Sequence, residues 1–191
     1  MKQTFLKKMK ENPIIVAVKD INNMKDAIES DCTIIFLLCG NIFNLKENVK
    51  MAKDKGKIIF LHIDLIDGFS HDAVALKYIN EEIKPDGIIS TKNSQLKAAK
   101  ELGLLTIQRL FIIDSLSIQT TIKTSSLINP DAIEIMPGIR PKITKQLSTK
   151  LDVPVIVGGL ISEEKDITNA IENGALGVST SCKELWSVNL K

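Results

Sequence analysis

The chain has 191 residues, of which 44% are hydrophobic and 25% charged, and its formal net charge is +2. This composition is typical of a globular protein with one substantial core, and it lacks the strongly basic balance of many nucleic-acid-binding domains. Aromatic residues, at 4%, leave little material for stacking bases. No apolar run reaches the roughly 18 residues that a membrane span needs, so we expect no membrane contact.

Neither the N-terminus nor the cysteines point to secretion. The first residues, MKQTFLKKMKENP, are basic but lack the apolar stretch of a signal peptide. We expect residues 1–12 to form a short amphipathic lead-in to one domain over residues 1–191, and the protein to be cytoplasmic. Cys32, Cys39 and Cys182 form no CxxC pair or metal-like cluster, so we expect buried or partly buried thiols.

Short apolar runs rich in Ile, Leu and Val alternate with segments of helical periodicity. The runs are nearly continuous in hydrophobicity, as expected for parallel strands covered by helices. They span residues 14–18, 33–39, 57–63, 87–90, 105–111, 132–136, 153–157 and 176–180. Eight such strands predict an α/β fold, a compact, TIM-like (β/α)8 barrel of one domain. A doubly wound open sheet is the alternative and would require one or two of these strands to be wrong.

Two of the intervening segments carry specific helix predictions. In residues 70–84 the periodicity predicts one apolar face made of Ala73, Leu76, Ile79 and Ile83. In residues 162–174, Ser162 is the candidate N-cap. Because Lys165 follows it three residues later, in place of glutamate, no full capping box is expected.

The ends of the last two strands predict a phosphate site. In a barrel, functional groups lie at the carboxyl ends of the strands, and phosphate often binds after strands 7 and 8. Backbone N–H groups there can approach a ligand closely, hydroxyls can add donors, and a short helix starting near Cys182 would add its dipole. The candidates are Gly158, Gly159, Gly177, Ser179, Thr180 and Ser181. The alternative is a tight loop with serines that cap helices.

The stretch FLHIDLIDG adds polar groups at the end of the third strand. His62 and Asp64 are two residues apart and share one face. We expect Asp64 to bind ligand hydroxyls with His62 orienting it. With His71 and Asp72 the stretch invites a metal interpretation, but no second histidine is placed predictably near, and we expect no metal and no cofactor.

Charged residues occur at other strand ends. Lys19 follows the first strand and Lys92 the fourth, although a lysine at a helix start is usually solvated. Arg109 lies within the apolar run LLTIQRLFII, where a guanidinium needs a partner. That partner is either a carboxylate such as Glu134 or an anionic ligand.

Six motifs follow one another along the chain in this order: LHIDLIDG, GIISTK, IQRLFIIDS, IEIMPG, PVIVGGLI and GVSTSCKELW. On these motifs the chain resembles the glycerol-3-phosphate-responsive antiterminators of the glycerol uptake operon from about Pro13 to Trp186. The resemblance implies a regulator and not an enzyme. Such a protein binds sn-glycerol 3-phosphate and acts on leader mRNA of glycerol-utilisation genes to prevent premature transcription termination. The glycine and hydroxyl residues would then hold the phosphate, Asp64 and Glu134 would face the glycerol hydroxyls, and His62, Lys19 and Arg109 would line the base of the pocket.

Two positions depart from the family pattern. Lys19 stands where many relatives have arginine, which keeps the charge but loses the planar fork. Ser162 and two glutamates follow GGLI, where a basic residue is often found. These acidic side chains put a direct phosphate contact from the following helix in doubt, but not one from the backbone.

The surface that would bind RNA is not readable from the pattern. One candidate is Lys7, Lys8 and Lys10, and the other is the set Arg140, Lys142, Lys145 and Lys150, unless these are ordinary solvated faces. A homodimer would place two such strips side by side. Two rival functions remain: a barrel isomerase, aldolase or phosphodiesterase that acts on a small phosphorylated polyol, and a sensor of another phosphorylated metabolite that works through a protein partner.

Overall fold

The computed structural model describes residues 1–188 and 190 and contains a closed barrel of eight parallel strands. Each strand pairs with the next along the chain, and β1 also pairs with β8, so the predicted barrel is confirmed. Each strand begins and ends within two residues of the predicted range. The strands are β1 (Ile14–Val18), β2 (Ile34–Leu37), β3 (Ile58–His62), β4 (Gly87–Ser90), β5 (Leu105–Phe111), β6 (Ala132–Met136), β7 (Val155–Gly158) and β8 (Gly177–Thr180).

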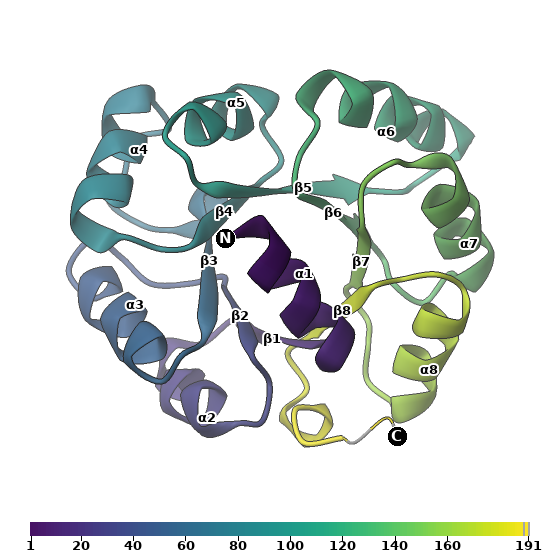
Figure 1. The fold of residues 1–191 in the computed structure, drawn as a ribbon, viewed down its shortest axis with the longest axis horizontal. Coiled ribbons are helices and arrows are strands. Elements are labelled where there is room, and N and C mark those ends of the chain that lie inside the picture. The colour runs from purple at the N-terminus through teal and green to yellow at the C-terminus, as the bar shows by residue number, and fades with distance from the viewer. Residues whose placement is uncertain (189, 191) are drawn as a thin grey trace.

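Helices surround the barrel as one outer layer (Figure 1). They are α2 (Met24–Glu29), α3 (Leu45–Asp54), α4 (Ala73–Tyr78), α5 (Asn93–Glu101), α6 (Ser115–Ile128), α7 (Pro141–Lys150) and α8 (Glu164–Glu172). A π-helical turn over Ile79–Ile83 extends α4, and a single 3₁₀ turn over Lys183–Leu185 follows β8. Within the described residues no helix combines the length and apolarity that crossing a membrane requires.

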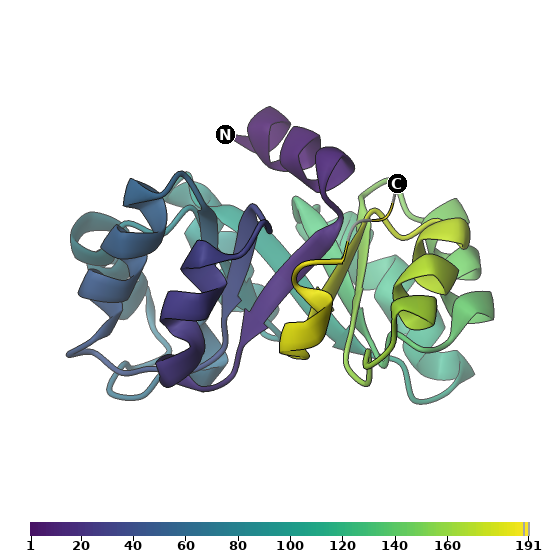
Figure 2. The ribbon, with the colours of Figure 1, turned by 90° about the horizontal axis from the view of Figure 1, so that it is seen from below.

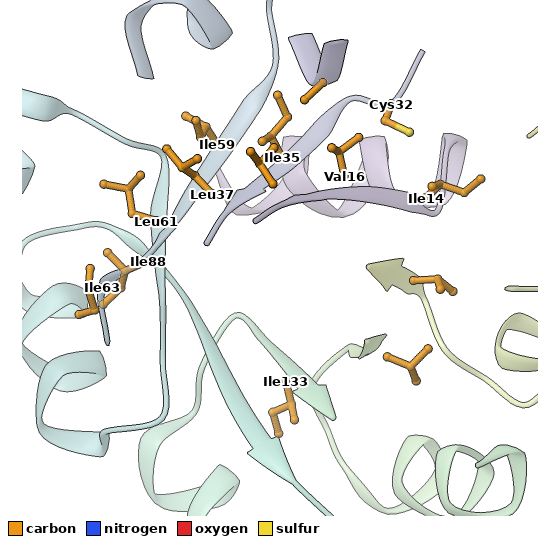
Figure 3. Packing of buried hydrophobic residues seen from close by; sticks show 14 of the residues in the cluster. Ile14, Val16, Cys32, Ile35, Leu37, Ile59, Leu61, Ile63, Ile88 and Ile133 are labelled. Carbon is orange, nitrogen blue, oxygen red and sulfur yellow. The ribbon is translucent and has the colours of Figure 1, made fainter. Parts of the chain in front are cut away.

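Most of the core lies between the strands and the surrounding helices. Side chains that point outward from β1, β2 and β3, such as Val16, Ile35 and Leu61, are fully buried against the helix layer (Figure 3). Burial of each such side chain contributes on the order of 1.5–3 kcal/mol, which accounts for the continuous hydrophobicity of these strands.

The N-terminal lead-in is a helix, α1 (Lys2–Glu11), that closes one end of the barrel. It crosses the barrel opening in Figure 1 and lies above one end of it in Figure 2. Phe5 and Met9 are fully buried and pack with the inward residues at the amino ends of the strands; the ring centroids of Phe5 and Phe60 are 5.0 Å apart. The amino end of the barrel is therefore filled with apolar side chains, which leaves the carboxyl end for ligands.

This helix accounts for a correction to the predicted phosphate site. Gly177 is the first residue of β8, and a Cβ added to it would lie 2.8 Å from the sulfur of Met9. Gly177 thus makes room for α1 at the closed end of the barrel and lies outside the mouth.

Two of the helix predictions are wrong in detail. Ala73 is exposed, because α4 begins there, and the buried side of the segment carries Ala75 in its place. The N-cap of α8 is Glu163, not Ser162, and it forms a capping box with Asp166. The capping pair lies one residue further along the chain than Ser162 and Lys165, and its second member is aspartate and not glutamate.

Candidate functional site

The inside of the barrel changes from apolar to polar along the strands. Phe60 of β3 and Ile107 of β5 belong to the inner apolar cluster that contacts α1. Because side chains on a strand alternate, the residues two positions further on also point inward, closer to the carboxyl end. These inward residues are His62, Arg109, Glu134, Gly158 and Ser179. A polar layer therefore lies directly above the apolar floor.

Glu134 is the centre of this polar layer. Its Oε2 accepts a hydrogen bond from Arg109 Nε at 2.6 Å, and its Oε1 accepts one from the Ser179 hydroxyl at 2.6 Å. The exposed fractions of Arg109 and Glu134 are 6% and 0%. The barrel-internal partner predicted as one alternative for Arg109 is therefore present. Both carboxylate oxygens of Glu134 have partners, which satisfies a charge that would otherwise be costly to bury.

Gly158 makes this arrangement possible. A Cβ at this position would lie 2.3 Å from Ser179 Oγ and 2.6 Å from Glu134 Oε1, closer than real Cβ contacts come. Any side chain would therefore push apart the hydrogen-bonded pair. The position therefore requires glycine, because the neighbouring Ser179 and Glu134 side chains leave no space for a Cβ.

A cavity of about 50 Å³ opens at the carboxyl end, above Glu134. Many of the predicted site residues line it, together with apolar residues from β1, β6, the segment after β2 and the loop after β7. The lining consists of Ala17, Lys19, Leu38, Arg109, Glu134, Met136, Gly159, Leu160, Ile161, Ser179, Thr180 and Ser181. The structure thus brings together at one mouth the groups that the sequence placed at five different strand ends.

The turn after β7 has an unusual backbone conformation and unpaired backbone N–H groups. Gly159 and Leu160 both have positive φ, +75° and +61°, and for leucine this left-handed conformation is strained. Over the part of the chain that the structure describes, no protein acceptor takes a hydrogen bond from the backbone N–H of Gly159, Leu160 or Ser181. Consecutive unpaired N–H groups in such a turn form a concavity that favours an anion.

Lys19 supplies a positive charge at the rim of the cavity. Its side chain is exposed, whereas Arg109, the other cation lining the cavity, is committed to Glu134. Among the described residues no carboxylate lies within ion-pair distance of the Lys19 ammonium. The pocket prediction placed Lys19 at the base of the site. The structure places it at the rim, where it can meet a charged group that enters from solvent.

Thr180 has a supporting position. Its hydroxyl donates to the carbonyl of Ile161 at 2.9 Å and accepts from the backbone N–H of Cys182 at 3.1 Å. Its carbonyl accepts a hydrogen bond from the indole Nε1 of Trp186 at 3.0 Å. Thr180 therefore fixes the loop after β7 to the end of β8. The helix predicted near Cys182 is only one 3₁₀ turn, so the dipole that it could add is small.

His62 is buried in the polar layer as a neutral imidazole. Burial, together with the nearby Arg109 cation, lowers the pKa of His62 to about 4, and Asp64 only partly opposes this. Its Nδ1 is 4.0 Å from Asp64 Oδ2, beyond hydrogen-bond distance, and has no partner among the described residues. His62 therefore does not orient Asp64 by the direct contact that the sequence suggested.

Asp64 is oriented by residues at the end of β4 instead. It accepts hydrogen bonds from the Ser90 hydroxyl at 3.1 Å and from the backbone N–H and hydroxyl of Thr91 at 2.8 and 3.1 Å. Lys92 Nζ is 4.0 Å from Asp64 Oδ1 and is half exposed. Asp64, Lys92 and His62 do not line the 50 Å³ cavity, so the predicted pocket divides into two adjacent groups. Ser90 was missed; its only signal is a hydroxyl at the end of an apolar strand.

The described residues contain no group of three or more His, Cys, Asp or Glu side chains that could hold a metal ion. His71 and Asp72, which extended the metal-like pattern, are exposed, and Asp72 caps α4 by accepting from the backbone N–H of Ala75.

Comparison with known proteins places this geometry in a family. Residues 14–186 match the family model described as glycerol-3-phosphate responsive antiterminator. The uncharacterized protein YgcP of Escherichia coli K12 is 42% identical over 183 residues, which cover 96% of each chain.

Two crystal structures are also similar. The glycerol uptake operon antiterminator regulatory protein of Listeria monocytogenes is 39% identical, covers 92% of this chain and 95% of its own, and has a TM-score of 0.87. A glycerol uptake operon antiterminator-related protein of Thermotoga maritima is 28% identical, covers 91% and 96%, and has a TM-score of 0.80. The chain thus belongs to the glycerol-3-phosphate responsive antiterminator family.

Proposed function

We propose that this chain is a cytoplasmic regulator that senses sn-glycerol 3-phosphate and prevents premature transcription termination in leader mRNA of glycerol-utilisation genes. The main support for ligand binding is the set of unpaired N–H groups at Gly159, Leu160 and Ser181, which we call the cradle and which lies beside the unpaired ammonium of Lys19. Such a constellation suits a dianionic phosphate on a small molecule, and membership of the family supports glycerol 3-phosphate as that molecule.

The glycerol end of the ligand would face the polar floor. Glu134 keeps unshared lone pairs on both oxygens, and the Ser179 oxygen can still accept a hydrogen bond. Ligand hydroxyls can therefore bind without breaking the Arg109–Glu134 pair. Asp64 lies beside the cavity and already accepts hydrogen bonds from Ser90 and Thr91. It would accept a further hydrogen bond from a ligand hydroxyl that extends toward β3.

The size of the cavity suggests how ligand binding changes the protein. Its volume of about 50 Å³ is small for a ligand of the size of glycerol 3-phosphate. The loop that carries Gly159 and Leu160 would therefore move outward to admit the ligand and then close on it. RNA binds more tightly in the presence of the ligand if it prefers that closed state, and the two affinities are then linked reciprocally.

A regulatory role, and not turnover of the ligand, fits the state of the carboxylates. Glu134 is fixed between Arg109 and Ser179, and Asp64 accepts hydrogen bonds from two neighbouring residues. Among the described residues, Glu134 has no free titratable partner in the cavity. His62 and Lys92, the titratable groups beside Asp64, lie outside the cavity, and each is 4.0 Å from its carboxylate, beyond the hydrogen-bond distance that general acid–base chemistry uses. We expect glycerol 3-phosphate to remain unchanged when it is incubated with the protein and followed by phosphorus NMR.

The experiment that tests ligand sensing is thermal unfolding with millimolar glycerol 3-phosphate, with glycerol and inorganic phosphate as controls. A ligand at about 100 times its dissociation constant adds roughly 2.7 kcal/mol of stability, a readily measured shift. The Gly159→Asp variant, which puts an anion in the cradle, should lose the shift. Transcription through a glycerol-operon leader, with and without ligand, then tests antitermination. An unchanged melting temperature at saturating ligand would contradict the proposed sensor.

A further inference from the structure

The outer surface of α6 and α7 has an unusual charge distribution. Between Ser115 and Leu151 the only acidic residues are Asp131, which pairs with Lys2 at the closed end of the barrel, and Glu134, which is buried inside it. The same stretch carries five cations: Lys123, Arg140, Lys142, Lys145 and Lys150. Because the whole chain has a net charge of only +2, this basic surface is a local concentration and not a general property of the protein.

These cations are not used by the fold. Within the part of the chain that the structure describes, no carboxylate lies within 4.0 Å of their side-chain nitrogens and none of them donates a hydrogen bond. The remaining exposed side chains of α7 are Gln146 and Thr149, and those of α6 are mostly Ser, Thr and Gln. Along the sequence the stretch is flanked by exposed Asp114 and Asp152, and the neighbouring helix α8 carries exposed Glu164 and Glu172. A surface of unpaired cations with uncharged hydrogen-bonding neighbours is complementary to a polyanion.

The other basic strip suggested by the sequence is different. On α1, Lys2 pairs with Asp131, Lys7 lies 3.7 Å from Glu11, and Lys8 donates to the carbonyl of Gly56. The helix also lies at the closed end of the barrel, away from the cradle (Figure 2). The structure therefore distinguishes two candidates that looked equivalent in the sequence.

The shape of the surface adds to the charge argument. A hollow of about 490 Å³ lies at the start of α7, lined by Arg140, Pro141, Lys142 and Ile143. The atoms that line it are apolar, and an unstacked base can lie against such a surface. A second hollow, of about 290 Å³, lies between the ends of α6 and α7 beside Lys150. The ten residues of α7, roughly 15 Å long, connect the two.

The surface also begins next to the ligand cavity. The backbone N–H of Gly138 donates to the carbonyls of Gly158 and Gly159 at 2.6 and 3.1 Å. Arg140 follows two residues later and α7 starts at Pro141. A movement of the Gly159 turn on ligand binding is therefore transmitted directly to the start of the basic surface.

We propose that the outer face of α7, with the adjoining face of α6, is the surface that binds single-stranded RNA. Lys142 and Lys145 contact phosphates and Arg140 holds a base in the hollow. This inference rests on the proposed function, because it assigns the RNA of that function to one face. In this proposal, the hydrogen bonds from the backbone N–H of Gly138 to the turn after β7 connect the ligand cavity with the RNA-binding surface.

The test is fluorescence anisotropy with a labelled glycerol-operon leader transcript and a labelled oligo(U), measured over a series of salt concentrations with and without glycerol 3-phosphate. Each lost phosphate contact lowers the salt slope of a single strand by about 0.7, so Lys142→Gln/Lys145→Gln should lower it by roughly 1.4. Lys7→Gln/Lys10→Gln on α1 removes the same charge and should leave the slope unchanged. Arg140→Lys keeps the charge and should weaken binding at an unchanged slope.

The outcomes separate the surface from the function. If the α1 double variant lowers the slope and the α7 variant does not, the proposed surface is wrong while the RNA-binding function stands. If the unaltered chain binds neither RNA at any ligand concentration, the surface and the proposed function both fail. If the α7 variant binds RNA normally but no longer supports antitermination, the face serves a protein partner and the inference is overturned. Equal melting temperatures of the two double variants exclude an effect of unfolding.

Discussion

Arg109 and Glu134 form a buried ion pair across neighbouring strands, with Nε and Oε2 2.6 Å apart and the two residues directly opposite in the β5–β6 register. A buried pair of this kind seldom stabilises a protein more than apolar residues of the same volume would, because both charges lose their hydration. The pair lies at the floor of the cavity at the carboxyl end, where the proposed ligand would meet it. It holds Glu134 at a defined place while neutralising it.

The first prediction concerns this pair. Arg109→Met should lower the free energy of unfolding by about 3–5 kcal/mol, because it leaves the Glu134 carboxylate buried without its cation. Arg109→Met combined with Glu134→Leu should recover most of that loss. Urea denaturation of the natural chain, the Arg109→Met and Glu134→Leu single variants and the double variant measures both effects. A double variant as unstable as the single one would contradict the desolvation argument, and stabilisation by glycerol 3-phosphate should be absent from both variants.

The fold was predictable because each strand buries both of its faces. Residues 14–18 are apolar throughout and buried, and β1 occupies that same range. What covers each face was not predictable. The periodicity of residues 2–11 marks an amphipathic helix, but only the closed barrel shows that Phe5 and Met9 fill its amino end.

The candidate site was predictable as a set of strand ends but not as a set of contacts. Glycine looks the same at either end of a strand, so Gly177 was assigned to the mouth although it makes room for Met9. His62 and Asp64 share a face, yet the hydrogen bonds of Asp64 go to Ser90 and Thr91 of the next strand. Partners across strands depend on register, which a single sequence does not specify.

The second prediction concerns Gly158. Gly158→Ala places a methyl group 2.3 Å from Ser179 Oγ, so the Ser179–Glu134 hydrogen bond must break or the strands must separate. We expect a loss of about 1–3 kcal/mol in the free energy of unfolding, typical of an overpacked core. Adding Ser179→Ala removes one of the two clashes and should restore part of the loss. If the two substitutions simply add, the clash with Ser179 is not the cause.

The third prediction is a pH dependence that originates at His62. Burial and the Arg109 cation lower the pKa of His62 to about 4, whereas an unfolded histidine titrates near 6.5. The unfolded chain therefore binds the proton more tightly between these values. The contribution of neutral His62 to the free energy of unfolding is therefore complete above about pH 6.5. It is lost as the pH falls toward 4, and the loss reaches up to about 3 kcal/mol. The difference in unfolding free energy between the natural chain and His62→Gln, measured from pH 4 to 7, isolates this effect. A difference that does not vary with pH would mean that the pKa of His62 is the same in the folded and unfolded chains.

The last prediction concerns the strained turn of the cradle. Leu160 has φ of +61° and is 69% exposed, so its side chain contributes little packing while its backbone conformation costs roughly 1–2 kcal/mol. Leu160→Gly removes the strain but adds about 0.5–1 kcal/mol of chain entropy to the unfolded state, so a net gain of about 0.5–1 kcal/mol is expected. Leu127→Gly is a matched control, because Leu127 is equally exposed but lies in α6 with a right-handed backbone. That variant should lose about 0.5–1 kcal/mol. Guanidinium denaturation without ligand measures both, and losses of the same size at the two positions would show that the left-handed turn stores no strain.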